Sequence, residues 1–354
     1  MKSNSRFFKK SKSLPVDKFF NNVLYDKKFG YYCSNFPFGK KGDFITAPKI
    51  SNLFSEMIAI WMISTWEIFK KPENFNIVEL GPGDGSLTKN IINVFKRFPE
   101  FNSSKNIFLL EKSELLKKLQ KKNINDNNVR WIKNYDNIKK GPIIFFGNEF
   151  LDAIPIKQFK RKKKDLLEKY YVFENNSKIK EKYKKISIKD MRVINSYKTL
   201  NKLKFIEFPK DAFKELKKIS KKILKLNGCL LLVDYGYLKS NNQNTLQSVR
   251  KHKKNHLLKN LGKSDVTSHI NFSLLNEFLI KNRLKVKETI TQEQFLKNMG
   301  IIERAEMISK KMKFSDQSNL YLRLKRLLSP SYMGTLFKVS LSYNCKYNNF
   351  FGFK

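Results

Sequence analysis

Apolar residues recur at two different periods along this chain, and the period separates its helices from its strands. A spacing of three to four residues predicts helices at 16–25, 50–69, 87–95, 115–121, 213–224, 272–280 and 301–312. Short apolar runs predict strands at 77–80, 107–110, 129–132, 143–146, 230–233 and 336–341. Because strands and helices alternate from residue 77 onward, the pattern is typical of an α/β, Rossmann-like doubly wound fold with a mostly parallel sheet.

Interruptions of this alternation suggest how the chain is divided. We expect residues 1–74 to form an N-terminal helical segment whose loop closes over the ligand site, with Thr46 capping the helix at 50–69. Residues 75–240 form the predicted core, which carries a basic hairpin insertion at about 157–192 on the rim of the sheet, with its turn at 175–177. Residues 241–343 begin with a long polar loop, up to about residue 270, and complete the fold with helices and a closing strand, and 344–354 are a tail.

The composition is that of a globular protein, because 41% of its 354 residues are hydrophobic. No apolar run approaches the roughly 18 residues of a membrane span, and the basic N-terminus lacks the apolar stretch of a secretory signal. The three isolated cysteines predict free thiols in a reducing compartment, and His252 and His256 lack a third ligand for a metal. We therefore expect no metal site and a bacterial cytoplasmic protein, with the mitochondrial matrix as the alternative.

The formal net charge of +41 would attract nucleic acid, anionic membranes or acidic proteins. The lysines are spread along the whole chain, however, and accompany many Asn, Ile and Phe residues, as an A- and T-rich genome would encode. The charge is therefore weak evidence for a nucleic-acid partner.

The stretch IVELGPGDGSL at 77–87 reads as a strand, a glycine turn and the start of a helix. A dinucleotide fingerprint would be G-x-G-x-x-G, whereas Gly81, Gly83 and Gly85 are spaced G-x-G-x-G and follow an acid, Glu79. This spacing suits S-adenosyl-L-methionine better, since its amine and carboxylate can be held by turn amides and acids. A glycine turn without a ligand is the plainer alternative.

Acids and amides follow the strands next to this turn. Glu111 ends the second strand, where a doubly wound fold places the acid that accepts hydrogen bonds from ribose hydroxyls. The fourth strand is followed by Asn148, Glu149 and Asp152. Carboxylates suit a cationic substrate such as arginine. A carboxylate can also accept the proton released on methyl transfer. The alternative is that Asn148 and Asp152 cap the next turn. Four more residues could line the same site: Asp43, Thr46, Asp234 and Tyr235.

Several motifs stand together in one order. They are GYY at 30–32, GDFITAP at 42–48, VELGPGDGSL at 78–87, NEFLDAIPIKQF at 148–159, LLLVDYG at 230–236, SDVTSHINF at 264–272, TQEQFLKNMGIIERA at 291–305 and MGTLFKV at 333–339. Over residues 13–343 the chain resembles the mitochondrial complex I assembly arginine methyltransferase family and its bacterial relatives.

The resemblance implies a class I methyltransferase fold that uses S-adenosyl-L-methionine, and protein arginine methylation. For mitochondrial members it implies symmetric dimethylation of an arginine on a subunit of NADH:ubiquinone oxidoreductase (complex I) during assembly. By position, the glycines match the family's cofactor turn, Glu111 its ribose acid, and Asn148, Glu149 and Asp152 its N-E-F-x-D-A motif. Two alternatives remain: an assembly chaperone with little catalysis, and an RNA methyltransferase, although an N-P-P-Y-like motif is missing.

Three positions depart from the family pattern. Lys49 stands where the family usually has an acid, Asn271 replaces the acid of an H-V-D-F motif, and His256 stands near the place of an aspartate. These changes concern substrate identity more than cofactor binding.

Overall fold

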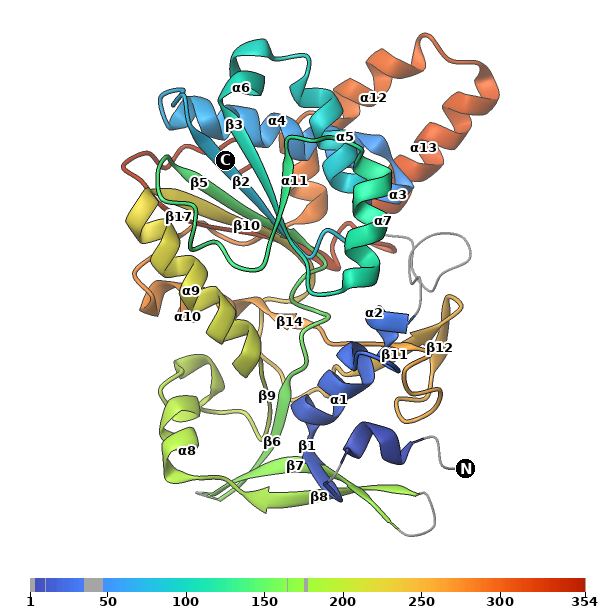
Figure 1. Cartoon of the computed structure of the whole chain (residues 1–354), viewed down its shortest axis with the longest axis vertical. Helices are drawn as coiled ribbons and strands as arrows, with labels where there is room; N and C mark the ends of the chain where they lie inside the picture. Colours follow the sequence, from blue (N-terminus) through green and yellow to red (C-terminus); the bar gives the residue numbers. More distant parts are fainter. Residues whose placement is uncertain (1–3, 10, 35–46, 164, 175–177, 354) are drawn as a thin grey trace. The chain divides into compact units, whose positions relative to one another are not determined.

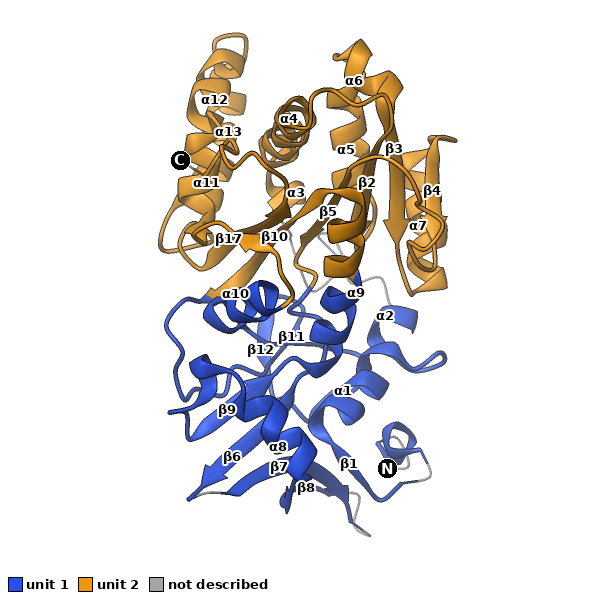
Figure 2. Ribbon diagram, turned by 90° about the vertical axis from the view of Figure 1, so that its left-hand side faces the viewer, with its two compact units in different colours: residues 1–44, 151–218, 237–281 blue, residues 45–150, 219–236, 282–354 orange. Residues whose placement is uncertain are grey.

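The computed structural model describes residues 4–9, 11–34, 47–163, 165–174 and 178–353. The chain splits into two compact units, which Figure 2 distinguishes by colour. Unit 1 comprises residues 1–44, 151–218 and 237–281, and unit 2 comprises residues 45–150, 219–236 and 282–354. These limits differ from the expected boundaries at 74 and 240, because each unit gathers segments that are distant in sequence.

The sheet of unit 2 is mostly parallel, as the sequence predicts. Its strand order is β15-β17-β10-β5-β2-β3-β4, in which β10, β5, β2, β3 and β4 are parallel and β17 is antiparallel to β10. The strands are β2 (Phe75–Leu80), β3 (Lys105–Leu110), β4 (Val129–Ile132), β5 (Ile143–Asn148), β10 (Gly228–Tyr237), β15 (Lys285–Val286), β16 (Ile290–Thr291, paired with β17) and β17 (Phe337–Asn344). Because the chain runs from β2 to β3 and later returns to β5 on the other side of β2, the doubly wound switch point lies between β2 and β5.

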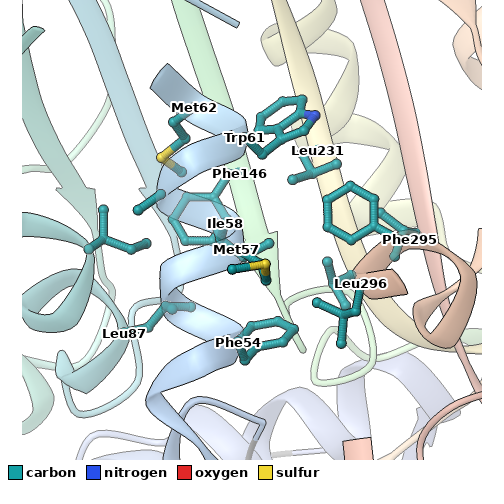
Figure 3. Packing of buried hydrophobic residues seen from close by; sticks show 14 of the residues in the cluster. Phe54, Met57, Ile58, Trp61, Met62, Leu87, Phe146, Leu231, Phe295 and Leu296 are labelled. Atoms are coloured by element: carbon teal, nitrogen blue, oxygen red, sulfur yellow. The ribbon is translucent and has the colours of Figure 1, made fainter. Parts of the chain in front are cut away.

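The helices of unit 2 include one that is buried on most of its surface. This helix, α4, packs against the face of the sheet that carries alternate residues such as Ile77, Phe146 and Leu231 (Figure 3). The helices are α3 (Ala47–Ile50), α4 (Asn52–Ile68), α5 (Ser86–Phe95), α6 (Pro99–Ser104), α7 (Glu114–Ile124), α11 (Gln292–Asn298), α12 (Ile301–Ser309) and α13 (Phe314–Leu328), and α9 (Lys210–Leu226) begins in unit 1 and ends in unit 2.

The predicted helix at 50–69 is present, but its start is different. The helix α4 begins at Asn52, and its cap is Ser51, whose Oγ accepts a hydrogen bond from the Leu53 N–H. Ser51 has extended backbone and a short hydroxyl side chain, which suits this role. Thr46, the predicted cap, lies outside the described residues.

Unit 1 contains an antiparallel sheet in the order β1-β7-β6-β9, with β8 paired to β7. Its strands are β1 (Ser13–Pro15), β6 (Lys157–Lys162), β7 (Asp165–Phe173), β8 (Ile179–Lys185) and β9 (Phe205–Phe208). The predicted hairpin is present, because β7 and β8 pair with Phe173 opposite Ile179, while its turn at 175–177 lies outside the described residues. The segment does not pair with the parallel sheet, however: it belongs to a separate sheet, whose buried side chains include Phe159, Leu166 and Tyr171.

The core of unit 1 is built on α1 (Val16–Tyr25), a helix whose limits match the prediction. Its Phe19 and Phe20 contact the ring of Tyr171 on β7, with centroid separations of 5.0 and 5.7 Å. The other helical segments of unit 1 are the 3-10 turns η1 (Ser5–Phe8) and η2 (Lys198–Leu200), α2 (Tyr31–Ser34), α8 (Ile188–Asn195) and α10 (Phe272–Lys281). The N-terminal segment and the basic insertion thus share one hydrophobic core.

The stretch that we expected to be a long polar loop contains a small antiparallel sheet, in the order β12-β11-β13. Its strands are β11 (Gln247–Arg250), β12 (Lys253–Asn255) and β13 (Asp265–Thr267), and the two residues Ile270–Asn271 form β14. Strands of three or four residues are too short for an alternating pattern to be recognised, which explains the wrong prediction. Among the helices of the described residues, none combines the length and the apolar character that crossing a membrane requires.

Candidate active site

The glycine turn follows β2 and leads directly into α5, as predicted (Figure 1). Gly81, Gly83 and Gly85 all have positive φ, of 65°, 58° and 82°. A Cβ on Gly81 would lie 3.2 Å from the ring of Phe150, and one on Gly85 would lie 3.0 Å from Ile124. Glycine is therefore required both by the backbone conformation and by the close packing around the turn.

The side chain of Asp84 holds this turn through both of its carboxylate oxygens. Its Oδ1 accepts hydrogen bonds from the backbone N–H and the Oγ of Ser86, at 3.1 and 2.7 Å. Its Oδ2 lies 2.6 Å from the Nζ of Lys49, on α3. Lys49, where the family usually has an acid, thus forms a half-buried ion pair with the turn.

Glu79 is buried inside β2 with only 4% of its surface exposed. Its Oε2 accepts a hydrogen bond from the Oγ1 of Thr88, on α5. Burial raises the pKa of Glu79 to about 7; the hydrogen bond from Thr88 lowers it, and the nearby Asp84 and Glu111 raise it further. The predicted cofactor acid therefore lies next to the turn, and at neutral pH a large part of it is protonated.

Glu111 directly follows β3, beside the first residue of the turn, because Gly81 N–H donates to the carbonyl of Leu110 at 3.0 Å. Its Oε1 accepts hydrogen bonds from the N–H groups of Lys112 and Ser113, both at 2.8 Å. Burial raises the pKa of Glu111, and hydrogen bonds from Ser113, Gln120 and Lys112 oppose that rise. The predicted ribose acid is thus held in one orientation at the carboxyl end of the sheet.

Asn148 and Glu149 stand at the carboxyl end of β5, the neighbour of β2. Glu149 has φ of 52°, a left-handed conformation that is costly for this residue type, and its N–H donates to the carbonyl of Val233 at 2.9 Å. Asn148 Nδ2 donates to Glu149 Oε1 at 3.2 Å, whereas the buried Asn148 Oδ1 has no hydrogen-bond partner among the described residues. Such a buried acceptor is suited to an N–H donor of a ligand.

Asp234 and Tyr235, on the adjacent strand β10, also make contacts within the fold. Asp234 Oδ1 accepts a hydrogen bond from the N–H of Tyr235 at 2.9 Å, and the Tyr235 ring lies 5.4 Å from that of Phe337. Asp43, like Thr46, lies outside the described residues.

Asp152 belongs to unit 1, where the structure brings three motifs together. The hydroxyl of Tyr32 donates to both oxygens of Asp265, at 3.1 and 2.9 Å, and the backbone carbonyl of Asp152 accepts from Ser268 N–H at 3.2 Å. Burial raises the pKa of Tyr32 well above its usual value. Electrostatic interaction with Asp265, Tyr25 and Asp152 raises it further. Sequence reasoning missed Tyr32 and Asp265 as candidates, although the motifs GYY and SDVTSHINF contain them.

A pocket in unit 1 lies beside this cluster. Its lining is mainly apolar, with Leu151, Phe213 and Leu275 among its residues, and it includes the polar side chains of His269 and Asn271. Burial lowers the pKa of His269. Asn271 Oδ1 accepts from Leu274 N–H at 3.1 Å and so caps α10, a role that an amide fills as well as the family's acid would.

Comparison with known proteins identifies the family of this chain. Residues 57–290 match the model of a family described as "Putative S-adenosyl-L-methionine-dependent methyltransferase". The chain is similar to a protein of Danio rerio named protein arginine methyltransferase NDUFAF7, mitochondrial, with 28% identity over 92% of this chain and 82% of the relative. The human protein of the same name is 26% identical over 92% of this chain and 78% of the relative.

Among solved structures, a protein from Burkholderia thailandensis bound to S-adenosyl-homocysteine has the same fold. The TM-score is 0.81 and the sequence identity 19%, over 99% of this chain and 91% of that one. The predicted doubly wound methyltransferase fold is thereby confirmed.

Proposed function

Because the chain belongs to the family of S-adenosyl-L-methionine-dependent methyltransferases, we propose that it is a protein arginine N-methyltransferase. We further propose that its substrate is a subunit of NADH:ubiquinone oxidoreductase and that it dimethylates an arginine symmetrically during assembly of that complex. The names of the relatives support the arginine assignment. The observation that carries it is the amide and carboxylate pair, Asn148 and Glu149, at the end of β5.

The residues present fit the cofactor. The glycine turn exposes backbone without Cβ atoms, and Glu111 supplies a fixed carboxylate at the end of the next strand for the ribose hydroxyls. Glu79 adds a buried acid beside the turn. When bound, S-adenosyl-L-methionine supplies an electrophilic methyl group on a sulfonium.

The chain's own residues bind and orient the arginine. A guanidinium is a planar cation that pairs with carboxylates, so Glu149 holds it electrostatically while Asn148 Oδ1 accepts one of its N–H groups. The hydrogen bond from Asn148 Nδ2 orients the Glu149 carboxylate, and the left-handed backbone of Glu149 is strain of the kind that clusters at active sites. Methylation of a guanidinium nitrogen releases a proton, which the carboxylate of Glu149 or Asp152 accepts.

A labelling experiment tests the function. The protein is incubated with radiolabelled S-adenosyl-L-methionine and fractionated lysate, and the products are treated with protease or ribonuclease. Label that only protease removes, and that acid hydrolysis recovers as symmetric dimethylarginine, supports the proposal. Label lost to ribonuclease would identify an RNA methyltransferase, and cofactor binding without any transfer would indicate an assembly chaperone.

The variant Asp152→Asn tests the catalytic assignment. We expect it to lower methyl transfer by at least about tenfold, because an amide cannot accept the proton, while affinity for S-adenosyl-homocysteine changes little. Asp211→Asn is the control, since Asp211 is another acid of unit 1 and forms an exposed ion pair with Lys18. Equal loss of transfer and cofactor affinity in Asp152→Asn would make Asp152 a structural residue.

The partner and the compartment belong to the same proposal. A protein substrate follows from the arginine assignment, and the relatives with the names given above are mitochondrial proteins. For this chain the bacterial cytoplasm stays the predicted compartment, with the mitochondrial matrix as the alternative.

A further inference from the structure

We propose that Gln120, on α7, is a positioning residue that holds the ribose acid Glu111 and the glycine turn in a fixed relation. This inference rests on the proposed role of Glu111 in binding the cofactor. Gln120 is completely buried, and it shares the buried side of α7 with Leu116 and Ile124. A carboxamide at such an apolar position must be satisfied by hydrogen bonds.

All the polar atoms of Gln120 have partners, and the partners come from three other elements. Its Nε2 donates to the carbonyl of Gly83 at 2.8 Å and to Oε2 of Glu111 at 3.1 Å. Its Oε1 accepts from the indole Nε1 of Trp131, on β4, at 2.9 Å. One side chain therefore connects the glycine turn after β2 with the acid after β3.

The orientation of this amide is determined by its partners. The indole N–H can only donate, so the Gln120 oxygen must face Trp131 and the NH₂ group must face Gly83 and Glu111. A reversed amide would place its oxygen, which can only accept, against the Gly83 carbonyl and the Glu111 carboxylate, which are also acceptors. Trp131 thus selects the orientation in which Gln120 donates to Glu111.

This donation favours the ionised form of Glu111. Burial raises the pKa of that carboxyl, and the hydrogen bond from Gln120 lowers it, together with those from Ser113 and Lys112 and the charge of Lys117. The carboxylate form has no proton of its own and can accept hydrogen bonds from both ribose hydroxyls. Gln120 occupies one acceptor direction of Oε2 and leaves the remaining capacity for the ligand.

A second amide on α7 provides a control, because it is hydrogen-bonded to the glycine turn but not to the acid Glu111. Asn123 Nδ2 donates to the carbonyl of Asp84 at 2.9 Å, so it also holds the glycine turn. No hydrogen bond links Asn123 to Glu111 within the described part of the chain. Loss of Asn123 should loosen the turn without changing the ionisation of Glu111.

The test is the affinity for S-adenosyl-homocysteine, measured by calorimetry between about pH 5 and pH 8. For Gln120→Met we expect about tenfold weaker binding at pH 7, the loss of one hydrogen bond to a charged group. We also expect the pH at which affinity falls to move upward, because Glu111 is protonated more easily. Asn123→Ala should weaken binding without this pH shift. Glu79 also titrates nearby and is present in all these proteins. Its pKa moves downward when Glu111 is protonated, so Glu79 does not produce the expected upward shift.

Trp131→Phe is the second variant, in case Gln120→Met folds poorly. It keeps an aromatic ring but removes the indole N–H, so Gln120 Oε1 loses this hydrogen bond and the amide is held less firmly. A smaller shift in the same direction is expected. An unchanged pH profile in both variants would overturn the proposal. Failure of the ribose assignment itself gives a different result: Glu111→Gln would then bind S-adenosyl-homocysteine as tightly as the native protein.

Discussion

Glu79 shows how one buried carboxyl group beside the cofactor turn makes stability depend on pH. It lies within a central strand, and its hydrogen bond from Thr88 does not compensate for the loss of water, so its pKa is raised to about 7. In the unfolded chain its pKa would be close to 4.5. Between these two values the folded protein binds a proton that the unfolded chain releases.

We therefore predict that Glu79→Gln removes a pH-dependent destabilisation. The native protein gains full stability from protonated Glu79 below about pH 4.5, and it loses this gain as the pH rises through about 7. The loss corresponds to about 3 kcal/mol in the free energy of unfolding at pH 8. The glutamine side chain of the variant stays neutral and can still accept the Thr88 hydroxyl, so the variant should be the more stable protein at pH 8. Urea unfolding of the cofactor-free proteins at several pH values measures this difference.

The exposed acid Glu303 provides the matched control for this experiment. Glu303→Gln removes a surface carboxyl group and so controls for the change in net charge alone. A native protein and a Glu79→Gln variant with parallel stability curves from pH 4 to pH 8 would show that Glu79 is not protonated in the fold.

At the level of elements, the connection from β2 through the glycine turn to α5 depends on backbone that only glycine adopts easily. Gly83 has φ of 58°, and valine in that conformation costs about 1–3 kcal/mol, so its backbone would shift. We predict that Gly83→Val abolishes binding of S-adenosyl-homocysteine while the fold persists, since the core of unit 2 does not depend on this residue. Calorimetry measures the binding, and circular dichroism and thermal unfolding measure the fold.

Gly300→Val is a suitable control for backbone strain alone. Gly300 caps α12 with φ of 81°, and the nearest atom to an added Cβ is Glu303 Oε2, at 3.6 Å. This variant should lose stability but keep its affinity for the cofactor product. Normal affinity in Gly83→Val would contradict the assignment of the turn to the cofactor.

The elements that the sequence predicts well are those whose signal is local. The helix at 16–25 and the strands of the parallel sheet follow from the apolar period within a few residues. Tyr32 and Asp265 are 233 residues apart, so their hydrogen bond has no local signal. Gln120 did have a local signal. It is a polar residue four positions from both Leu116 and Ile124, on the apolar side of the helix. Its partners after β3, on β4 and in the glycine turn could be known only from the fold.

For the whole molecule, the dominant electrostatic feature is the formal net charge of +41. Ion pairs oppose this repulsion, but several are largely exposed, such as Lys71 with Glu100 and Lys185 with Asp165. Exposed pairs contribute about 0–1 kcal/mol each and are weakened by salt. Repulsion among the unbalanced lysines acts over longer distances and involves many more charges.

We therefore predict that added salt stabilises this protein. Raising the ionic strength from about 0.01 M to about 0.15 M shortens the Debye length from about 30 Å to about 8 Å, which screens distant repulsion more than contact pairs. The urea midpoint at pH 7 should rise with sodium chloride, and urea is the appropriate denaturant because it carries no charge. Sodium sulfate at equal ionic strength separates two causes of the increase. Screening raises the urea midpoint as much as sodium chloride does, apart from the general stabilising effect of sulfate. Binding of multivalent anions raises the midpoint further, and this additional rise saturates with concentration. A midpoint that falls with sodium chloride would mean that the ion pairs, and not the excess of lysine, dominate the electrostatic free energy of folding.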